Sequence, residues 1–194
     1  MIMTNTLREK LAAGTPTLGT HYLSPDADLP ELIGDTGLYD YGEYCAEYSA
    51  FNMQLLYHMA RSGQCANLPL MIKPDQMSQG FWAQAAIGAG FKAVLFTDVR
   101  SADDVWRCHH AMRPDNPSSK GLMGVKLRRP ALSNYHTGQY LDDLNSLVFA
   151  IMIEKNVALD DIDAVLSAAK EAGVDMTQWG PADFGFSRGQ PDLM

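Results

Sequence analysis

Two acidic residues, Glu154 and Asp183, are the pair in this sequence best suited to carry chemistry together. Glu154 directly follows the apolar run from Leu147 to Ile153, and Asp183 ends the segment Gly180-Pro181-Ala182-Asp183. Carboxylate oxygens are the ligands that hard divalent cations such as Mg²⁺ and Mn²⁺ prefer, with water or substrate completing the coordination. The pair therefore predicts a metal site. Two solvated or helix-capping carboxylates are the alternative interpretation.

Other polar side chains follow predicted strands in the same manner. They are Glu43-Tyr44, Lys73-Pro74 and Thr97-Asp98. Ligands of parallel α/β proteins bind at the carboxyl ends of the strands, so these residues are candidates for the same site. The sequence has no Gly-x-Gly-x-x-Gly after its first predicted strand, no phosphate-loop motif and no Gly-x-Ser-x-Gly. These absences argue against a dinucleotide enzyme and against a serine hydrolase.

Six segments predict strands, and apolar residues with helical spacing lie between them. Several of the segments are continuously apolar, which is typical of strands that are covered on both faces. Strands that alternate with helices pair in parallel through right-handed crossovers. Two α/β architectures fit this order, an open doubly wound sheet and a β/α barrel. The predicted strands are Thr17–Leu23, Tyr39–Tyr44, Pro69–Lys73, Ala93–Thr97, Leu147–Glu154 and Met176–Trp179.

The bulk composition indicates one globular domain spanning residues 1–194. The net charge is −8, and no basic patch stands out beyond Lys126, Arg128 and Arg129, so nucleic acid is not an expected partner. The longest apolar run is far shorter than a membrane span, and the polar N-terminus does not resemble a secretory signal. We therefore expect a cytoplasmic protein without a membrane partner.

Several motifs occur in an order that resembles the HpcH/HpaI aldolase/citrate lyase family of metal-dependent 2-oxo acid aldolases. The similarity runs along the whole chain, and the two motifs nearest its end are the most specific. The motifs are Leu7-Arg8-Glu9-Lys10-Leu11 with Gly14, Thr17-Leu18-Gly19-Thr20, Gly42-Glu43-Tyr44, Ile72-Lys73-Pro74, Ile151-Met152-Ile153-Glu154, Gly173-Val174-Asp175 and Gly180-Pro181-Ala182-Asp183.

The resemblance implies a (β/α)8 TIM barrel, of which this chain contains about six βα units. It implies that Glu154 and Asp183 hold a divalent metal, Mg²⁺ or Mn²⁺ with Co²⁺ as a further alternative. It also implies that Lys73, Gly180 and Ala182 bind the substrate. The implied reaction cleaves a 4-hydroxy-2-oxo acid into pyruvate and an aldehyde through a metal-stabilised enolate. A homo-oligomer is the implied assembly.

The sequence departs from the family at three points. Tyr44 stands at the position of the catalytic His, and an unperturbed tyrosine is a poor base at neutral pH. Lys73 stands at the position of an Arg and lacks its two-pronged grip on a carboxylate. The chain also stops soon after Asp183, about two βα units earlier than the family pattern.

These departures leave the chemistry open at several places. We expect Tyr44 and Lys73 to be catalytic, with Tyr44 assisting proton transfer or substrate orientation. His21 is an alternative base, and Asp98 a group that orients a water molecule. An oxaloacetate-type decarboxylase and a catalytically inactive, ligand-binding homologue are the alternative functions.

Overall fold

The computed structural model of the chain describes residues 4–126 and 137–192. Within these residues six strands form one parallel sheet, and all six lie inside or within one residue of the segments predicted from sequence. The predicted segments are longer because the flanking residues belong to the connections. The strands are β1 (Gly19–Tyr22), β2 (Tyr41–Cys45), β3 (Leu70–Lys73), β4 (Ala93–Phe96), β5 (Val148–Met152) and β6 (Met176–Gln178).

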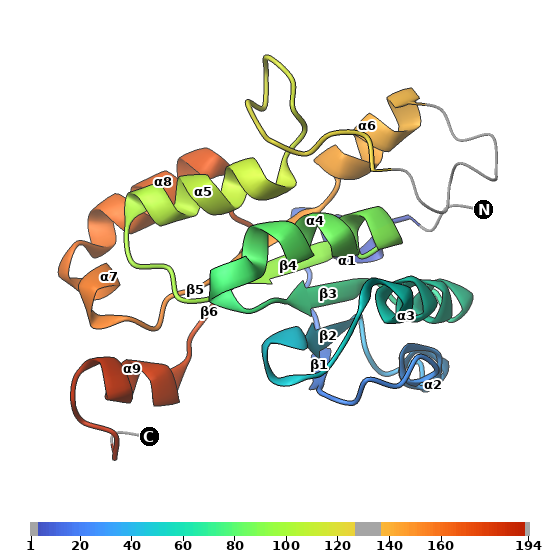
Figure 1. The fold of residues 1–194 in the computed structure, drawn as a ribbon, viewed down its shortest axis with the longest axis horizontal. Helices are drawn as coiled ribbons and strands as arrows, with labels where there is room; N and C mark the ends of the chain where they lie inside the picture. The colour runs from blue at the N-terminus through green and yellow to red at the C-terminus, as the bar shows by residue number, and fades with distance from the viewer. Residues whose placement is uncertain (1–3, 127–136, 193–194) are drawn as a thin grey trace.

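The order of the strands decides between the two predicted architectures. Each strand pairs in parallel with the next one along the chain, from β1 to β6. A doubly wound sheet reverses its strand order at a switch point, whereas a β/α barrel keeps the order of the chain. The fold is therefore a partial β/α barrel, as the family resemblance implied (Figure 1).

Five helices cover the outer face of the sheet in the same consecutive order (Figure 1). They are α2 (Leu29–Asp35), α3 (Met53–Cys65), α4 (Gln79–Ala89), α5 (Ala102–Met112) and α8 (Ile162–Ala172). Gly173 ends α8 in the left-handed conformation, with φ 73°, a conformation that glycine adopts without steric cost. No helix among residues 4–126 and 137–192 combines the length and apolar character needed to cross a membrane.

The remaining helices are short and lie at the two ends of the strands or in connections. They are α1 (Thr6–Ala12), α6 (Thr137–Asn145), α7 (Asn156–Asp160) and α9 (Pro181–Ser187), with the 3-10 turns η1 (Ala46–Tyr48) and η2 (Gln76–Ser78).

Alternation of side chains along the strands separates two apolar clusters. In β4, for example, Val94 and Phe96 pack outward against the helices, whereas Ala93 and Leu95 face the inside of the barrel. Successive residues of a strand point to opposite faces, so the face of each residue follows from its position. The same alternation determines which side chains near the carboxyl ends of the strands point into the barrel. A residue two positions after an inward-facing residue also faces inward.

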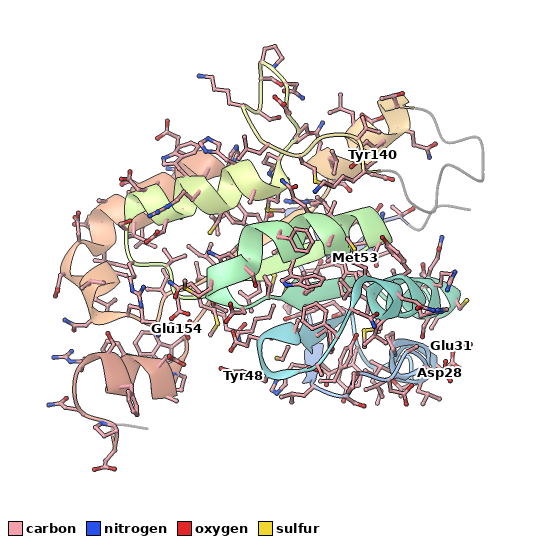
Figure 2. All side chains as sticks on the ribbon, viewed as in Figure 1. Asp28, Glu31, Tyr48, Met53, Tyr140 and Glu154 are labelled. Carbon is pink, nitrogen blue, oxygen red and sulfur yellow. The ribbon has the colours of Figure 1, made fainter. Side chains whose placement is uncertain are left out.

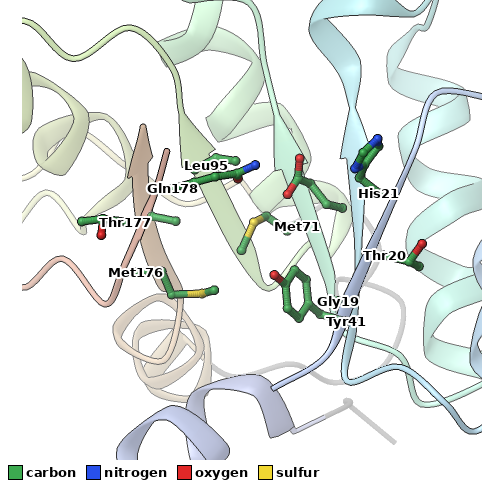
Figure 3. Close-up of a pocket in the computed structure, with 11 residues that line it drawn as sticks. Gly19, Thr20, His21, Tyr41, Met71, Leu95, Met176, Thr177 and Gln178 are labelled. Atoms are coloured by element: carbon green, nitrogen blue, oxygen red, sulfur yellow. The ribbon is translucent and has the colours of Figure 1, made fainter. Parts of the chain in front are cut away.

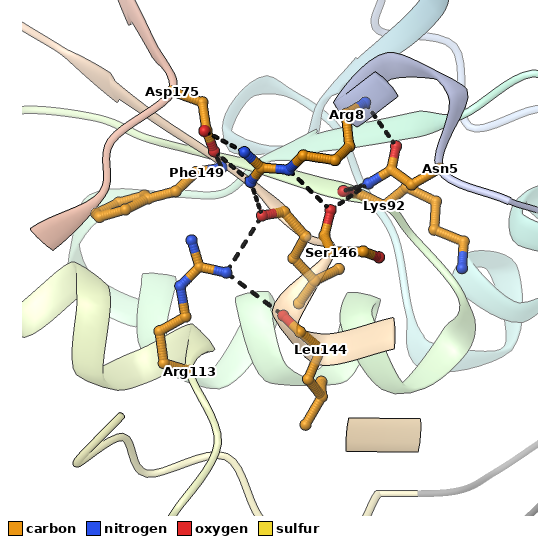
Figure 4. A network of polar contacts seen from close by, with 9 residues as sticks. Asn5, Arg8, Lys92, Arg113, Leu144, Ser146, Phe149 and Asp175 are labelled. Carbon is orange, nitrogen blue, oxygen red and sulfur yellow. Dashed lines mark hydrogen bonds and ion pairs between the residues drawn. The ribbon is translucent and has the colours of Figure 1, made fainter. Parts of the chain in front are cut away.

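Helix α1 closes the amino end of the barrel (Figure 4). Asn5 donates hydrogen bonds to the carbonyl oxygens of Lys92, at 2.9 Å, and Ser146, at 2.7 Å. Arg8 forms an ion pair with Asp175 and donates to the carbonyl oxygen of Leu147 at 2.6 Å. These partners precede β4, β5 and β6, so α1 ties the amino ends of three strands together.

We expect Asn5→Ala to destabilise the fold. Asn5 is 4% exposed, and its side chain caps α1 by accepting a hydrogen bond from the Arg8 N–H. It also donates to the carbonyl oxygens of Lys92 and Ser146, which each keep one other donor. Losing an N-cap costs about 0.5–2 kcal/mol, which for a chain of this size lowers the Tm by roughly 2–4 °C per kcal/mol. Thermal unfolding measures the effect. Asn145→Ala, at an exposed position of α6, is the matched control, and an equal Tm for both variants would contradict the role of α1.

Candidate metal and substrate site

Glu154 lies at the carboxyl end of β5 on the inner face of the barrel. Ala150 and Met152 face inward, so a residue two positions further also points inward. The Glu154 side chain is 3% exposed, and its Oε1 accepts a hydrogen bond from the Asp98 N–H at 3.1 Å. The Asp98 backbone has a left-handed conformation, with φ 57°, which is uncommon for a residue other than glycine. The connection after β4 is thus shaped to hold this carboxylate.

Asp183 lines the same cavity as Glu154, so the structure brings the two predicted metal ligands together. It belongs to the first turn of α9, which follows β6 at the same end of the sheet (Figure 1). Gly180, just before α9, packs against Glu154 so closely that a Cβ placed there would lie 2.0 Å from Glu154 Oε2. A glycine is therefore needed where the segment between β6 and α9 meets the carboxylate.

The cavity at this end of the barrel has a volume of about 200 Å³ and an acidic lining. Figure 2 labels two of its residues, Tyr48 and Glu154. Five of the seven lining residues carry carboxylates, and two lysines, Lys73 and Lys155, form ion pairs with three of these carboxylates. Such a surplus of negative charge attracts cations. The lining residues are Glu47, Tyr48, Asp75, Gln76, Asp98, Glu154 and Asp183.

The surroundings of Glu154 disfavour its charged form. Burial raises the pKa of Glu154 above its ordinary value, and the negative charges of Asp183 and Asp98 raise it further. The hydrogen bond from the Asp98 N–H and the charge of Lys155 act in the opposite direction and lower the pKa. A buried carboxylate with raised pKa beside two others gains the most from a bound cation.

Lys155 is the cation nearest to the predicted metal ligands. Its ammonium forms ion pairs with Asp98 and with Asp183, the latter at 2.7 Å between Nζ and Oδ1. The Lys155 side chain is largely buried. Asp183 therefore already has a cationic partner in this structure, whereas Glu154 has no direct contact with the ammonium among the ion pairs of the described residues.

The structure corrects the predicted position of Tyr44. The prediction ended β2 at Tyr44, but the strand continues to Cys45, and Tyr44 points outward into the helix layer. Its side chain is 0% exposed, stacks near Tyr22 and donates a hydrogen bond to Ser49 Oγ at 2.9 Å. Glu43 and Tyr44 are neighbours in a strand and must face opposite sides. Tyr44 therefore does not line the cavity that contains Glu154.

Two residues that the sequence reading missed, Glu47 and Tyr48, do line that cavity. They form part of the η1 turn directly after β2, and Tyr48 is 63% exposed. The missed signal is that the dipeptide Glu-Tyr occurs twice, at 43–44 and again at 47–48. The second copy lies beyond the strand and faces the cavity.

Glu47 connects Tyr48 with Lys73. Lys73 Nζ donates to Glu47 Oε1 at 2.9 Å and lies 5.1 Å from the centre of the Tyr48 ring. The hydrogen bond to Glu47 raises the pKa of the Tyr48 hydroxyl, and burial and the nearby carboxylates act in the same direction. The Tyr48 hydroxyl therefore stays protonated at neutral pH and can donate a hydrogen bond. Lys73, predicted to bind substrate, lies behind Glu47 and not among the residues lining the cavity.

A second cavity, of about 250 Å³, lies on the inner face of the barrel nearer its amino end (Figure 3). His21, considered as an alternative base, lines this cavity together with Glu43 and Tyr41, and it does not line the cavity that contains Glu154. Glu43 is 6% exposed, and its Oε1 accepts a hydrogen bond from Cys45 Sγ at 3.4 Å. Burial raises the pKa of Glu43, while the Cys45 hydrogen bond, Lys73 and His21 lower it.

We expect Glu43→Gln to increase stability at neutral pH. Between the ordinary carboxyl pKa and the raised pKa, folded Glu43 holds a proton that the unfolded chain has released. The free energy of unfolding therefore falls as pH rises through this window and stays lower above it. The neutral glutamine removes that loss. Urea unfolding at about pH 4 and about pH 8 tests this, since the variant should exceed the wild type only at the higher pH.

His109 and Lys126 do not line the acidic cavity. His109, in α5, has its ring nitrogens 2.9 Å from the Ala172 carbonyl oxygen and 3.2 Å from that of Ser119, which is a packing role. Lys126 donates to Gln84 Oε1 at 2.6 Å. Arg128 and Arg129 lie outside the described residues. Ala182 is exposed on α9, beside Asp183.

The described residues fit a metal site with few protein ligands. In residues 4–126 and 137–192, no group of three or more His, Cys, Asp or Glu side chains is arranged to hold a metal. Two carboxylates, Glu154 and Asp183, line one cavity, and hard divalent cations accept such a set when water or substrate completes the coordination. Glu154 is buried and Asp183 is half-exposed, and this donor set with its surplus of negative charge suits a hard divalent cation.

Six βα units in consecutive order, with acidic side chains at the carboxyl ends of the strands, define a partial β/α barrel with its candidate site where such barrels bind ligands. No family model matches the sequence. The 2-keto-3-deoxy-L-rhamnonate aldolases of Shigella boydii serotype 4 (strain Sb227) and Escherichia coli O157:H7 are each 28% identical over 193 residues, covering 98% of this chain and 69% of the relative.

Solved structures share the fold. An HpcH/HpaI aldolase/citrate lyase family protein from Burkholderia cenocepacia J2315 superposes with a TM-score of 0.83 at 23% identity, covering 98% of this chain and 76% of that one. An HpcH/HpaI aldolase from Desulfitobacterium hafniense DCB-2 gives a TM-score of 0.77 at 22% identity, covering 94% and 69%. These two likenesses show that the chain shares its fold with solved HpcH/HpaI proteins.

Proposed function

We propose that this protein is a divalent-metal-dependent carbon–carbon lyase that cleaves a 4-hydroxy-2-oxo acid to pyruvate and an aldehyde. The likeness to aldolases supports the lyase class. A 2-keto-3-deoxy acid, the kind of substrate in the names of the curated relatives, is itself a 4-hydroxy-2-oxo acid. The observation that carries the proposal is the acidic cavity that joins Glu154 to Asp183.

The charge of the cavity explains why the substrate needs a cation. A 2-oxo acid is an anion, and the carboxylates of the lining outnumber the two neighbouring ammonium groups. Glu154 and Asp183 would hold Mg²⁺ or Mn²⁺, and a bound divalent ion supplies the positive charge that stabilises the enolate oxygen. The backbone around Gly180 and Ala182 would bind the substrate carboxylate, as the family motif implies.

The proton of the substrate 4-hydroxyl would be transferred by a group of three residues, Glu47, Tyr48 and Lys73. The proton of the 4-hydroxyl passes through Tyr48 to Glu47 while the bond between C3 and C4 breaks. The electron pair of that bond forms the enolate of pyruvate, and the aldehyde leaves. The same proton then returns to C3 and completes pyruvate. Lys73 orients Glu47 through their 2.9 Å ion pair and adds positive charge for the carboxylate of the 2-oxo acid.

Pyruvate release from a series of 4-hydroxy-2-oxo acids, measured with Mn²⁺ or Mg²⁺ and again with a chelator, tests the proposal. We expect turnover only with metal, and for at least one sugar-derived 2-keto-3-deoxy acid. Turnover that persists unchanged in chelator would refute the metal-dependent mechanism.

An oxaloacetate-type decarboxylase is the second candidate function. The same cation and the same enolate serve it, but no base is required to deprotonate a hydroxyl. Two observations favour it: the hydrogen bond to Glu47 keeps Tyr48 protonated, and Lys73 engages Glu47. A direct comparison of oxaloacetate with 4-hydroxy-2-oxo acids at equal metal concentration separates the two functions.

A further inference from the structure

Lys155 has no role in the proposed reaction, although its ammonium stands beside the predicted metal ligands. The residue follows Glu154 in extended backbone, with φ −114° and ψ 137°, so its side chain leaves the strand on the side opposite to Glu154. It nevertheless reaches the cavity rim, where it pairs with Asp98 and Asp183. Only 13% of its side chain is exposed.

The two partners of Lys155 have different relations to the metal site. Asp183 is a proposed metal ligand, while Asp98 contributes its backbone N–H to Glu154. A divalent ion that binds Asp183 therefore meets the ammonium on the same carboxylate, and two positive charges on one carboxylate repel each other. The ammonium can relieve this repulsion by keeping Asp98 alone as its partner.

We infer that Lys155 is an internal cation that competes with the divalent metal for Asp183 and so sets the metal affinity of the site. The inference rests on the proposed metal-dependent function and deepens it. In the structure, Lys155 partly neutralises the acidic cavity and connects α9 to the segment after β4. On metal binding Asp183 changes partner.

Binding of Mn²⁺, followed by electron paramagnetic resonance of the free ion, tests this with the full chain and without any substrate. Lys155→Met removes the charge and keeps the apolar stem, so we expect its Kd for Mn²⁺ to fall about tenfold or more. Lys155→Arg keeps the charge and should stay within about threefold of the wild type. Lys170→Met, at an exposed position of α8, is the control and should not change the Kd.

A structural role for Lys155 predicts the opposite result. If the ammonium mainly holds Asp98 and Asp183 in position, Lys155→Met binds Mn²⁺ more weakly than the wild type, and the inference is overturned. An unchanged Kd overturns it as well. If Lys155→Met does not fold, Lys155→Gln replaces it in the test, because its neutral amide can still donate a hydrogen bond to Asp98. The expected fall in the Kd for Mn²⁺ and the outcomes that overturn the inference are the same.

The two proposals fail in different ways. Mn²⁺ binding by the wild type with an equal Kd in Lys155→Met removes only the inference on Lys155. If neither protein binds Mn²⁺, both the proposed metal-dependent function and the inference on Lys155 are refuted.

Discussion

Glu154→Gln should abolish Mn²⁺ binding and lower metal-dependent pyruvate release by about 10³-fold or more, because the metal contributes several kcal/mol of transition-state stabilisation. The substitution keeps the shape of the side chain and its acceptor oxygen for the Asp98 N–H. It removes the charge that would hold the metal between Glu154 and Asp183. Mn²⁺ titration and pyruvate release, measured on the same preparation, give the two readouts.

The variant should remain folded, which makes the loss of activity interpretable. Burial and two neighbouring carboxylates raise the pKa of Glu154, so a neutral side chain is better tolerated there than a charged one. We therefore expect a Tm equal to or above that of the wild type. Glu171→Gln, at an exposed position of α8, is the control for charge removal. Full activity of Glu154→Gln would show that the metal ligands lie elsewhere.

Gly180→Ala should weaken Mn²⁺ binding by about 10–100-fold, the range typical of residues that position metal ligands. The added Cβ would lie 2.0 Å from Glu154 Oε2 and 3.1 Å from Glu154 Cβ. Real Cβ atoms do not approach other atoms so closely, so the Glu154 carboxylate or the segment before α9 must move. Either movement separates Glu154 from Asp183.

Gly138→Ala is the matched control for this substitution. A Cβ at Gly138, in α6, meets no atom within 4 Å. We expect its Mn²⁺ affinity to match that of the wild type. Equal affinity in Gly180→Ala and Gly138→Ala would contradict the close packing of Gly180 on Glu154 as a requirement of the site.

The central strands could be predicted from the sequence because continuous apolar runs mark them. Ala93–Phe96 and Val148–Met152 are apolar throughout, and glycines such as Gly173 end the helices before them or after them. Their consecutive order could not be predicted from pattern alone. Apolar runs indicate burial on both faces, and a doubly wound sheet buries its strands in the same way.

The two carboxylates of the site were predictable, whereas its tyrosine was not. Glu154 ends an apolar strand, so its place at the open end follows from the strand itself. Tyr44 was expected at the site because it ends the predicted strand, but its neighbour Glu43 faces the inside of the barrel, so Tyr44 faces the helices. Tyr48 lies beyond the strand in the η1 turn, where strand alternation no longer indicates the direction of a side chain. The ion pairs of Lys155 needed the three-dimensional fold, because Asp98 and Asp183 are distant in sequence.

A crystal structure of the protein soaked with Mn²⁺ and pyruvate tests the central claim most directly. We predict an anomalous difference peak between the carboxylates of Glu154 and Asp183, with the 2-oxo acid beside it and the Tyr48 hydroxyl facing the substrate. At saturating Mn²⁺, the absence of a peak there, or a peak that leaves either carboxylate facing bulk solvent, would contradict the claim.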